Sequence, residues 1–144
     1  MSDYIAFARG FAMVCHEGQK YGKMDYYTHH VVPVFNKVDD LYSGDKDFHD
    51  LKVLATLHDC LEDSNKYTVE DYECCFTTKV VNALIAITKD KNESHNQYIE
   101  RVKQNELALK VKICDTICNL EESIKIQDSR RIIRYSEQLA RLYK

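Results

Sequence analysis

The scarcity of turn-forming residues is the feature that most limits how this chain can fold. It has one proline and four glycines among its 144 residues. A β-sheet protein of this length joins many strands by tight turns, and those turns depend on such residues. We therefore predict an all-α protein, a compact helical bundle of about seven or eight helices. Its length is typical of one domain, so we expect residues 1–144 to form a single domain.

Apolar residues recur three and four positions apart along almost the whole chain, as in helices packed on a core. Gly18 and Gly22 are expected to bracket a short loop, and Pro33 is expected in the first turn of its helix. Thr68 with Asp71 resembles a helix-capping pair. The helices are predicted at about 3–16, 28–42, 46–63, 68–75, 78–87, 94–104, 106–124 and from 128 or 129 onward.

Charge and composition favour a small partner over a large polyanion. The formal net charge is −3, so binding to nucleic acid would require a local basic patch. The candidates for such a patch are few: Lys20, Lys23, Arg130, Arg131 and Arg134. No uninterrupted apolar run approaches the length of a membrane span, and we expect a cytoplasmic protein. None of the six cysteines forms a C-x-x-C pair, so we expect reduced thiols rather than structural zinc or disulfides.

An adjacent histidine and aspartate stand out in the predicted helix 46–63. With His58 at zero on a helical wheel, Asp59 falls at about 100° and Glu62 at about 40°. Leucines cover the neighbouring arc, so the pair stands at the edge of the core. A solvated helix face would give the same pattern. A metal site is the alternative.

Asp115 favours the metal site. It lies within about 60° of Val111, Ala108 and Cys118 on its own helical wheel, which places a carboxylate in an apolar face. A buried carboxylate requires a cation or hydrogen-bond donors. Lys112 could supply that cation without any metal, and Asn119 is expected to face the same cavity.

The fourth ligand is expected from the start of the second helix, where His29 and His30 are neighbours. Two imidazoles and two carboxylates form a mixed nitrogen and oxygen site. This donor set suits manganese, iron or zinc and leaves positions for water and for a phosphate oxygen.

Four stretches of the sequence together resemble, in order, the motifs of the HD superfamily of metal-dependent phosphohydrolases. The resemblance is to the hydrolase domains of RelA/SpoT-type alarmone enzymes and their small stand-alone relatives, and it spans roughly residues 5–120. The stretches are HEGQ at 16–19, YYTH at 26–29, LHDCLED at 57–63 and VKICDTICNL at 111–120.

This resemblance implies an HD-type fold, one divalent ion that is usually manganese, and removal of the 3′-pyrophosphate from (p)ppGpp. It favours His29 over His30, because His30 falls where the family usually has proline. It implies acidic catalytic residues and a substrate pocket as well. The implied metal ligands are His29, His58, Asp59 and Asp115; the implied catalytic pair is Glu62 and Asp63; Lys112 and Asn119 are implied to contact the substrate.

The sequence departs from the family at the loop after Gln19, which lacks the usual cluster of arginines and lysine. Lys20 and Lys23 are expected to meet phosphates instead, and Tyr21 to stack on a base. Asp25 replaces a usual proline and Cys118 a usual histidine. These departures leave the metal chemistry in place and weaken the inference about the substrate.

Hydrolysis of a phosphate ester or pyrophosphate on a small nucleotide is thus the expected function, with (p)ppGpp the expected substrate. Two alternatives remain: a nucleoside monophosphate phosphatase, and a non-catalytic nucleotide-binding module of the same fold. The final helix lies beyond the resemblance. Its apolar residues would either cap the core or form a homo-oligomer interface: Ile132, Ile133, Leu139 and Leu142.

Overall fold

The structure is a computed structural model that describes residues 2–144. Helices dominate it, and the strands among the described residues form one short antiparallel hairpin. The all-α prediction is confirmed. The elements are α1 (Ser2–Cys15), β1 (Lys20–Tyr21), β2 (Met24–Asp25), a π-helical turn η1 (Tyr27–Val31), α2 (Val32–Tyr42), α3 (Phe48–Leu57), α4 (Cys60–Asp63), α5 (Val69–Cys75), α6 (Thr78–Ile87), α7 (His95–Lys103), α8 (Glu106–Lys125) and α9 (Ser129–Tyr143).

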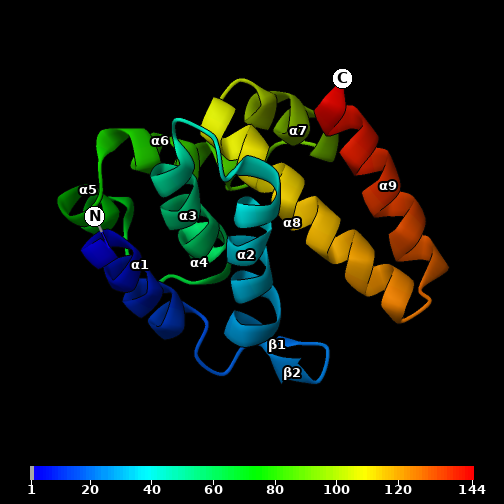
Figure 1. The fold of residues 1–144 in the computed structure, drawn as a ribbon, viewed down its shortest axis with the longest axis horizontal. Helices are drawn as coiled ribbons and strands as arrows, with labels where there is room; N and C mark the ends of the chain where they lie inside the picture. The colour runs from blue at the N-terminus through cyan, green and yellow to red at the C-terminus, as the bar shows by residue number, and fades with distance from the viewer. Residues whose placement is uncertain (1) are drawn as a thin grey trace.

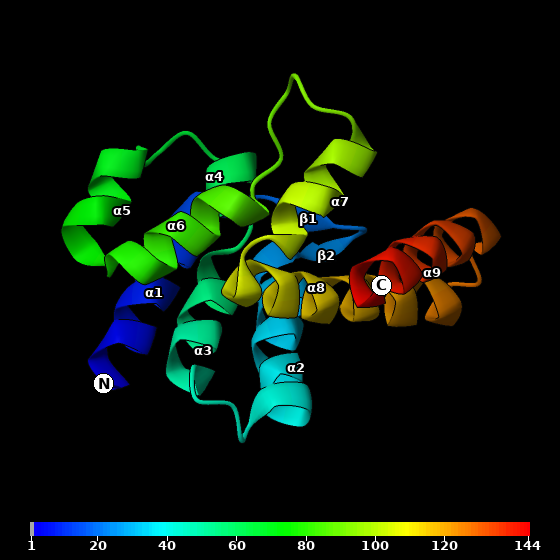
Figure 2. The same cartoon turned by 90° about the horizontal axis from the view of Figure 1, so that it is seen from above.

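Helix α3 lies in the middle of the arrangement, where α1, α2, α6 and α8 all pack against it. Helix α8 runs across the molecule, and α9 returns alongside it in the opposite direction (Figures 1 and 2). The hairpin β1–β2 projects at one end, next to the start of α2 (Figure 1). Helix α9 is therefore held mainly by α8, and it extends the molecule on one side of the core.

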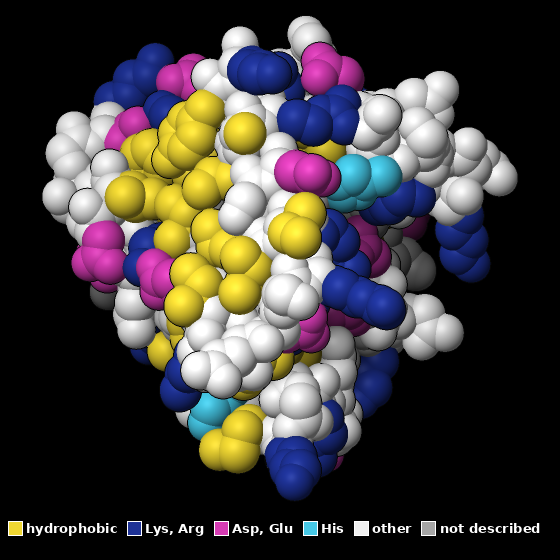
Figure 3. Space-filling view, turned by 90° about the vertical axis from the view of Figure 1, so that its right-hand side faces the viewer, with side chains coloured by type: hydrophobic (Ala, Val, Ile, Leu, Met, Phe, Trp, Pro, Cys, Tyr) yellow, Lys and Arg dark blue, Asp and Glu magenta, His cyan; other side chains and the backbone are white. Residues whose placement is uncertain are grey.

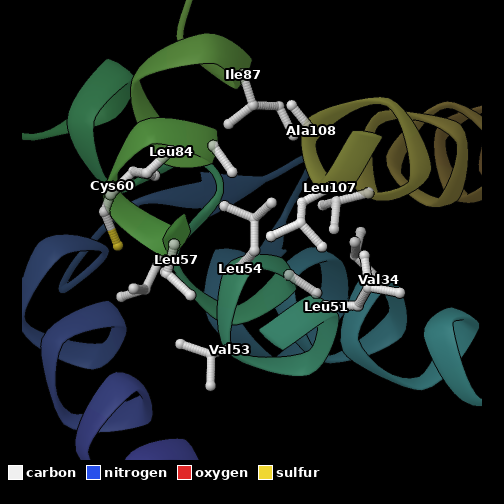
Figure 4. Packing of buried hydrophobic residues seen from close by; sticks show 14 of the residues in the cluster. Val34, Leu51, Val53, Leu54, Leu57, Cys60, Leu84, Ile87, Leu107 and Ala108 are labelled. Carbon is white, nitrogen blue, oxygen red and sulfur yellow. The ribbon is translucent and has the colours of Figure 1, made fainter. Parts of the chain in front are cut away.

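The core is built around α3, whose residues 51–57 are buried on every side of the helix. Leu51, Leu54 and Leu57 are fully buried, and Val53 is almost so. A helix that is hydrophobic all round can be stable in water only when other elements surround it. Leu84 of α6 and Leu107 of α8 approach Leu54 from the neighbouring helices (Figure 4). This packing fixes the C-terminal end of α3, where the chemistry of the chain begins.

Side-chain caps set the starts of several helices at the positions that the sequence indicates. The Thr68 hydroxyl accepts a hydrogen bond from the Asp71 amide, and the Asp71 carboxylate accepts one from the Thr68 amide, 2.8 Å away. The predicted capping pair is confirmed although aspartate is shorter than the usual glutamate. Ser94 and Gln97 make the same reciprocal pair at α7. Thr77, Asn105 and Asp128 cap α6, α8 and α9.

The prediction of one continuous helix over residues 46–63 was wrong in one respect. The helix is interrupted at His58 and Asp59, and it resumes as the short α4. Asp59 has φ −102° and ψ 0°, in the sparsely populated region between helix and strand where many active-site residues lie. A wheel with constant rotation therefore cannot describe how His58 and Asp59 converge.

The predicted loop around Gly22 is an ordered hairpin. Lys20 pairs with Asp25 and Tyr21 with Met24, so Gly22 and Lys23 form the turn. Gly22 has φ +63°, the left-handed conformation that glycine adopts without steric cost in the first turn position of such hairpins. The hairpin holds Tyr21 in a defined place next to α8.

None of the helices within residues 2–144 is long and apolar enough to cross a membrane. All six cysteines are free thiols, and Cys15, Cys60 and Cys114 are buried. The expectation of reduced cysteines therefore agrees with the structure.

Replacing Leu54 with alanine tests the central role of α3. Leu54→Ala should lower the free energy of unfolding by roughly 2–5 kcal/mol, because the vacated volume in a dense core cannot refill. Leu41→Ala is the matched control, since Leu41 is 43% exposed; it should change stability by less than about 0.5 kcal/mol. Urea unfolding followed by circular dichroism measures both. Equal losses in the two variants would contradict the assigned core.

Candidate metal centre

Four side chains from three separate parts of the chain meet at the end of α3. They are His30 from the π turn, His58 and Asp59 from the break between α3 and α4, and Asp115 from the middle of α8. One nitrogen or oxygen atom from each lies within 4.8 Å of the others. His30, His58 and Asp115 are almost completely buried. This candidate metal cluster is therefore at the boundary between the core and solvent.

The ring of His58 is oriented by the backbone beneath it. Its Nδ1 lies 2.7 Å from the Ala55 carbonyl oxygen, and this carbonyl can only accept, so Nδ1 carries the proton. Nε2 then faces the cluster, where it makes no hydrogen bond although Asp59 Oδ2 lies 3.0 Å away. Metal-binding histidines are typically fixed in this way by a carbonyl or carboxylate behind them. A buried Nε2 atom that faces carboxylates without a hydrogen bond fits a metal ligand.

The carboxylates form the other half of the cluster. Asp115 Oδ1 lies 2.9 Å from His30 Nε2, and Asp59 Oδ2 lies 3.0 Å from His58 Nε2. Burial by itself would raise the pKa of each carboxyl. The surrounding positive groups outweigh burial, with His58 the largest for Asp59 and Lys112 the largest for Asp115, so both pKa values lie well below the usual range.

The pKa values of the two imidazoles shift in the opposite direction, upward. Burial disfavours their protonated forms, but Asp59 and Asp115 outweigh it and raise the pKa of both His30 and His58. Histidine binds a metal through a neutral ring, so a cation that enters this cluster would displace protons from the imidazoles.

The prediction that His29 completes the cluster was wrong, because the structure brings His30 there instead. His29 is exposed, and its Nδ1 lies 3.1 Å from the Asp25 carbonyl oxygen. The cause is the π-helical turn Tyr27–Val31, in which the Val32 amide bonds to the Tyr27 carbonyl. A π turn contains about one residue more than an α turn. The inward-facing position therefore comes four residues after Tyr26 rather than three.

Tyr26, the first residue of the stretch YYTH, contacts the cluster directly. Its hydroxyl donates to Asp59 Oδ2 at 2.5 Å, and its ring lies against the ring of His30. Tyr26 thus holds one carboxylate of the cluster in position.

Asp115 is also held by the two residues that were expected beside it. Lys112 Nζ donates to Asp115 Oδ2 at 2.8 Å, and the Asn119 amide donates to Asp115 Oδ1 at 3.1 Å. The contact with Lys112 was the structural alternative to a metal. It engages only one carboxylate oxygen, and Oδ1 still faces His30 and His58.

Glu62 and Asp63 lie just beyond the cluster; both residues reach solvent, while their carboxyl groups are partly buried in the site. Glu62 Oε1 accepts a hydrogen bond from the Lys89 amide at 2.9 Å. Asp63 Oδ2 accepts one from the Gln19 side chain at 3.0 Å, and Gln19 in turn bonds to the buried His16. Partial burial in the site is the largest influence on both carboxyls and raises their pKa values.

A cavity of about 340 Å³ opens onto the cluster, which is within the range of pockets for small ligands. His30, Asp59, Asp115 and Glu62 line one part of it. Another part of its wall comes from α9, which the sequence analysis does not connect with the site. The additional lining residues are Tyr26, Lys89, His95, Tyr98, Arg131, Arg134, Tyr135 and Gln138, with Tyr21, Lys112 and Asn119 completing the cavity.

Arginines of α9 were considered in the sequence only as a basic patch for nucleic acid. Arg134 and Tyr135 follow Arg131 by three and four positions, which places all three on one face of a helix. This spacing is the signal that could have indicated a cavity wall. Seen from the side of α9, basic side chains gather close to acidic ones on one part of the surface, and hydrophobic side chains form a separate patch (Figure 3).

The hairpin contributes Tyr21 to the cavity but not its two lysines. The Tyr21 hydroxyl donates to Asn119 Oδ1 at 2.6 Å and lies 3.3 Å from Arg131 Nη2. Its ring also lies 5.0 Å from the ring of His30. Lys20 and Lys23 are exposed and are not among the residues that line the cavity. Their contact with substrate phosphates stays a prediction.

Comparison with known proteins gives a result at the level of the fold. No protein-family model matches the sequence, and no curated protein is similar enough in sequence to count as a match. A solved structure described as a metazoan ortholog of SpoT that hydrolyses ppGpp and plays a role in starvation responses superposes with a TM-score of 0.77. The two chains are 21% identical, and the match covers 99% of this chain and 86% of the other. The chain therefore has an all-α, HD-type fold, as the sequence motifs indicate.

Proposed function

We propose that this protein is a metal-dependent phosphohydrolase that acts on a small nucleotide. The observation that carries the proposal is the cluster of His30, His58, Asp59 and Asp115, with the Nε2 atom of His58 buried in it and free of hydrogen bonds. The cluster lies at one wall of a cavity with cationic and aromatic side chains. One domain would supply both the metal site and the substrate pocket.

The four residues would hold one divalent ion through two nitrogen and two oxygen donors, with manganese the proposed ion and iron or zinc suited to the same set. Such an ion, when bound, lowers the pKa of a coordinated water and polarises a phosphate oxygen. Lys112 keeps Asp115 ionised, and Tyr26 orients Asp59. These two residues maintain the donor set rather than take part in bond breaking.

Glu62 and Asp63 are the proposed acid and base. A carboxyl whose pKa is raised towards neutrality exchanges a proton with water or a leaving group more effectively than an ordinary carboxyl. Both pKa values are raised, and Glu62 lines the cavity. Glu62 would therefore be the group nearer to the substrate, with Asp63 held behind it by Gln19.

The cavity favours a substrate with at least two separated anionic groups. Lys112 donates to Asp115 of the cluster, whereas Arg131 and Arg134 line the cavity from α9. Arginine is well matched to phosphate, and tyrosine rings offer a surface for a base. We propose (p)ppGpp, with hydrolysis of its 3′-pyrophosphate, as the substrate, since it carries phosphates at both ends of the sugar. The alternative substrate is a nucleoside monophosphate.

The function is tested on the purified protein with added manganese. Bound metal is measured by elemental analysis, pyrophosphate release is followed from ppGpp, and phosphate release is followed from a panel of nucleotides. Turnover of ppGpp supports the full proposal, and turnover of monophosphates alone supports the alternative. Binding of nucleotide without turnover of any phosphate ester would instead indicate a non-catalytic module.

Replacing each of the two neighbouring histidines with alanine tests which of them is a metal ligand. His30→Ala should abolish manganese binding measured by calorimetry, and it should reduce turnover by at least about 100-fold, since a ligand to the ion is lost. His29→Ala is the matched control and should bind manganese like the unmodified protein. The reverse pattern would show that His29 is the ligand.

Removing the Arg131 side chain tests the part of the cavity wall that α9 supplies. Arg131→Ala should raise KM by about 10-fold with little change in kcat, because a phosphate contact made before and during reaction is lost. Arg130 is exposed and does not line the cavity, so Arg130→Ala serves as the control. An unchanged KM in Arg131→Ala would show that Arg131 of α9 does not contact the substrate.

A further inference from the structure

Arg101 of α7 is bonded far more extensively than a surface arginine requires. Its guanidinium donates to the carbonyl oxygens of Ala86 and Thr88 at 2.9 and 2.7 Å, just where α6 ends, with a longer bond to Ile85. It also holds Glu93 through two bonds, from Nη2 at 2.6 Å and from Nε at 3.1 Å. One side chain thus fixes both ends of the segment 88–93.

Glu93 continues this network inside the segment. Its Oε1, which faces Arg101, also accepts a hydrogen bond from the Asp90 amide at 2.8 Å. The Lys89 ammonium donates to the Glu93 carbonyl oxygen at 2.8 Å. Because the segment lacks regular secondary structure, these bonds largely determine its conformation.

The segment contacts the proposed acidic residue through a single backbone group. The Lys89 amide donates to Glu62 Oε1 at 2.9 Å. Lys89 lines the cavity next to the cluster, and it also borders a groove of about 730 Å³ whose lining includes Arg101 and Glu93. Glu62 is therefore connected to Arg101 by a continuous path, with the segment 88–93 in between.

A simple structural explanation is that Arg101 caps the carbonyl end of α6. Capping accounts for its bonds to Ala86 and Thr88, but it does not account for the two bonds to Glu93 or for the Glu93 bond to the Asp90 amide. Those additional bonds order the residues on either side of Lys89. Lysine could provide a cation for the cap, but it lacks the fork that engages both Glu93 oxygens.

We propose that Arg101 and Glu93 are positioning residues, which hold the Lys89 amide against Glu62 and so fix the orientation of this carboxylate towards the substrate. The proposal rests on the proposed function, in which Glu62 is a catalytic group. Neither Arg101 nor Glu93 lies among the residues that line the catalytic cavity. Their influence on the reaction is therefore indirect, through the segment 88–93.

Amide exchange tests the positioning without relying on activity. In Arg101→Lys, hydrogen exchange of the Lys89 amide, measured by NMR, should accelerate by roughly 10-fold or more, because the segment opens more often. Glu62→Ala should accelerate the same amide, since its acceptor is removed. The Leu54 amide in the core should be unchanged in both. Arg141→Lys is the control, because Arg141 contacts α7 at Glu100 on the surface.

Kinetics then test the consequence for the reaction. Arg101→Lys and Glu93→Gln should each lower kcat by roughly 10-fold, part of the 100-fold or more that a positioned acid or base supplies. KM and manganese affinity should stay within about 2-fold, because neither substrate nor ligand contacts are changed. Arg141→Lys should leave all three values unchanged.

The two measurements separate the failure of this inference from the failure of the proposed function. An unchanged hydrogen-exchange rate of the Lys89 amide in Arg101→Lys would overturn the inference, whatever the catalytic activity of that variant. Faster exchange with unchanged kcat would also overturn it, because Glu62 would then not depend on the segment. An unmodified protein without turnover of any phosphate ester would overturn the proposed function, and with it the catalytic role assigned here to Glu62.

Discussion

Two ionised carboxylates in a largely buried site are the constraint on which the rest of the structure depends. Asp59 and Asp115 approach the same small volume, and each would be costly to bury without positive charge nearby. The two imidazoles and Lys112 supply that charge here. The dense core around α3 holds the facing helices in place, so the four groups meet without a flexible loop between them.

Other features of the fold serve to orient these groups. The Ala55 carbonyl sets the proton of His58, Tyr26 holds Asp59, and Asn119 holds Asp115. The hairpin and α9 then close the cavity around them, with Tyr21 bonded to Asn119 and close to Arg131. A site with its side chains fixed in this way needs little reorganisation when an ion or a phosphate binds.

Much of this could be predicted from the sequence because it depends on local patterns. The period of apolar residues predicts the helices, and Thr68 predicts a cap from its spacing to Asp71. Asp115 could be assigned to a buried face by its position among Val111, Ala108 and Cys118. The four motifs, taken in order, predicted an HD-type fold, and the structural comparison confirms this fold.

The rest depends on departures from regular geometry or on distant contacts. No pattern in the sequence marks the π turn that rotates His30 inward in place of His29, or the break that lets His58 and Asp59 converge. The approach of Arg131 to Tyr21 joins residues far apart in the chain, so helical periodicity carries no information about it. Local backbone irregularities of this kind concentrate at functional sites.

A crystal structure of the protein soaked with manganese tests the central claim most directly. Anomalous scattering locates the ion without assumptions about the protein. We expect one peak about 2 Å from Nε2 of His30 and of His58 and from one oxygen each of Asp59 and Asp115. A peak bound by His29, or the absence of any peak at these four residues at saturating manganese, would contradict the account.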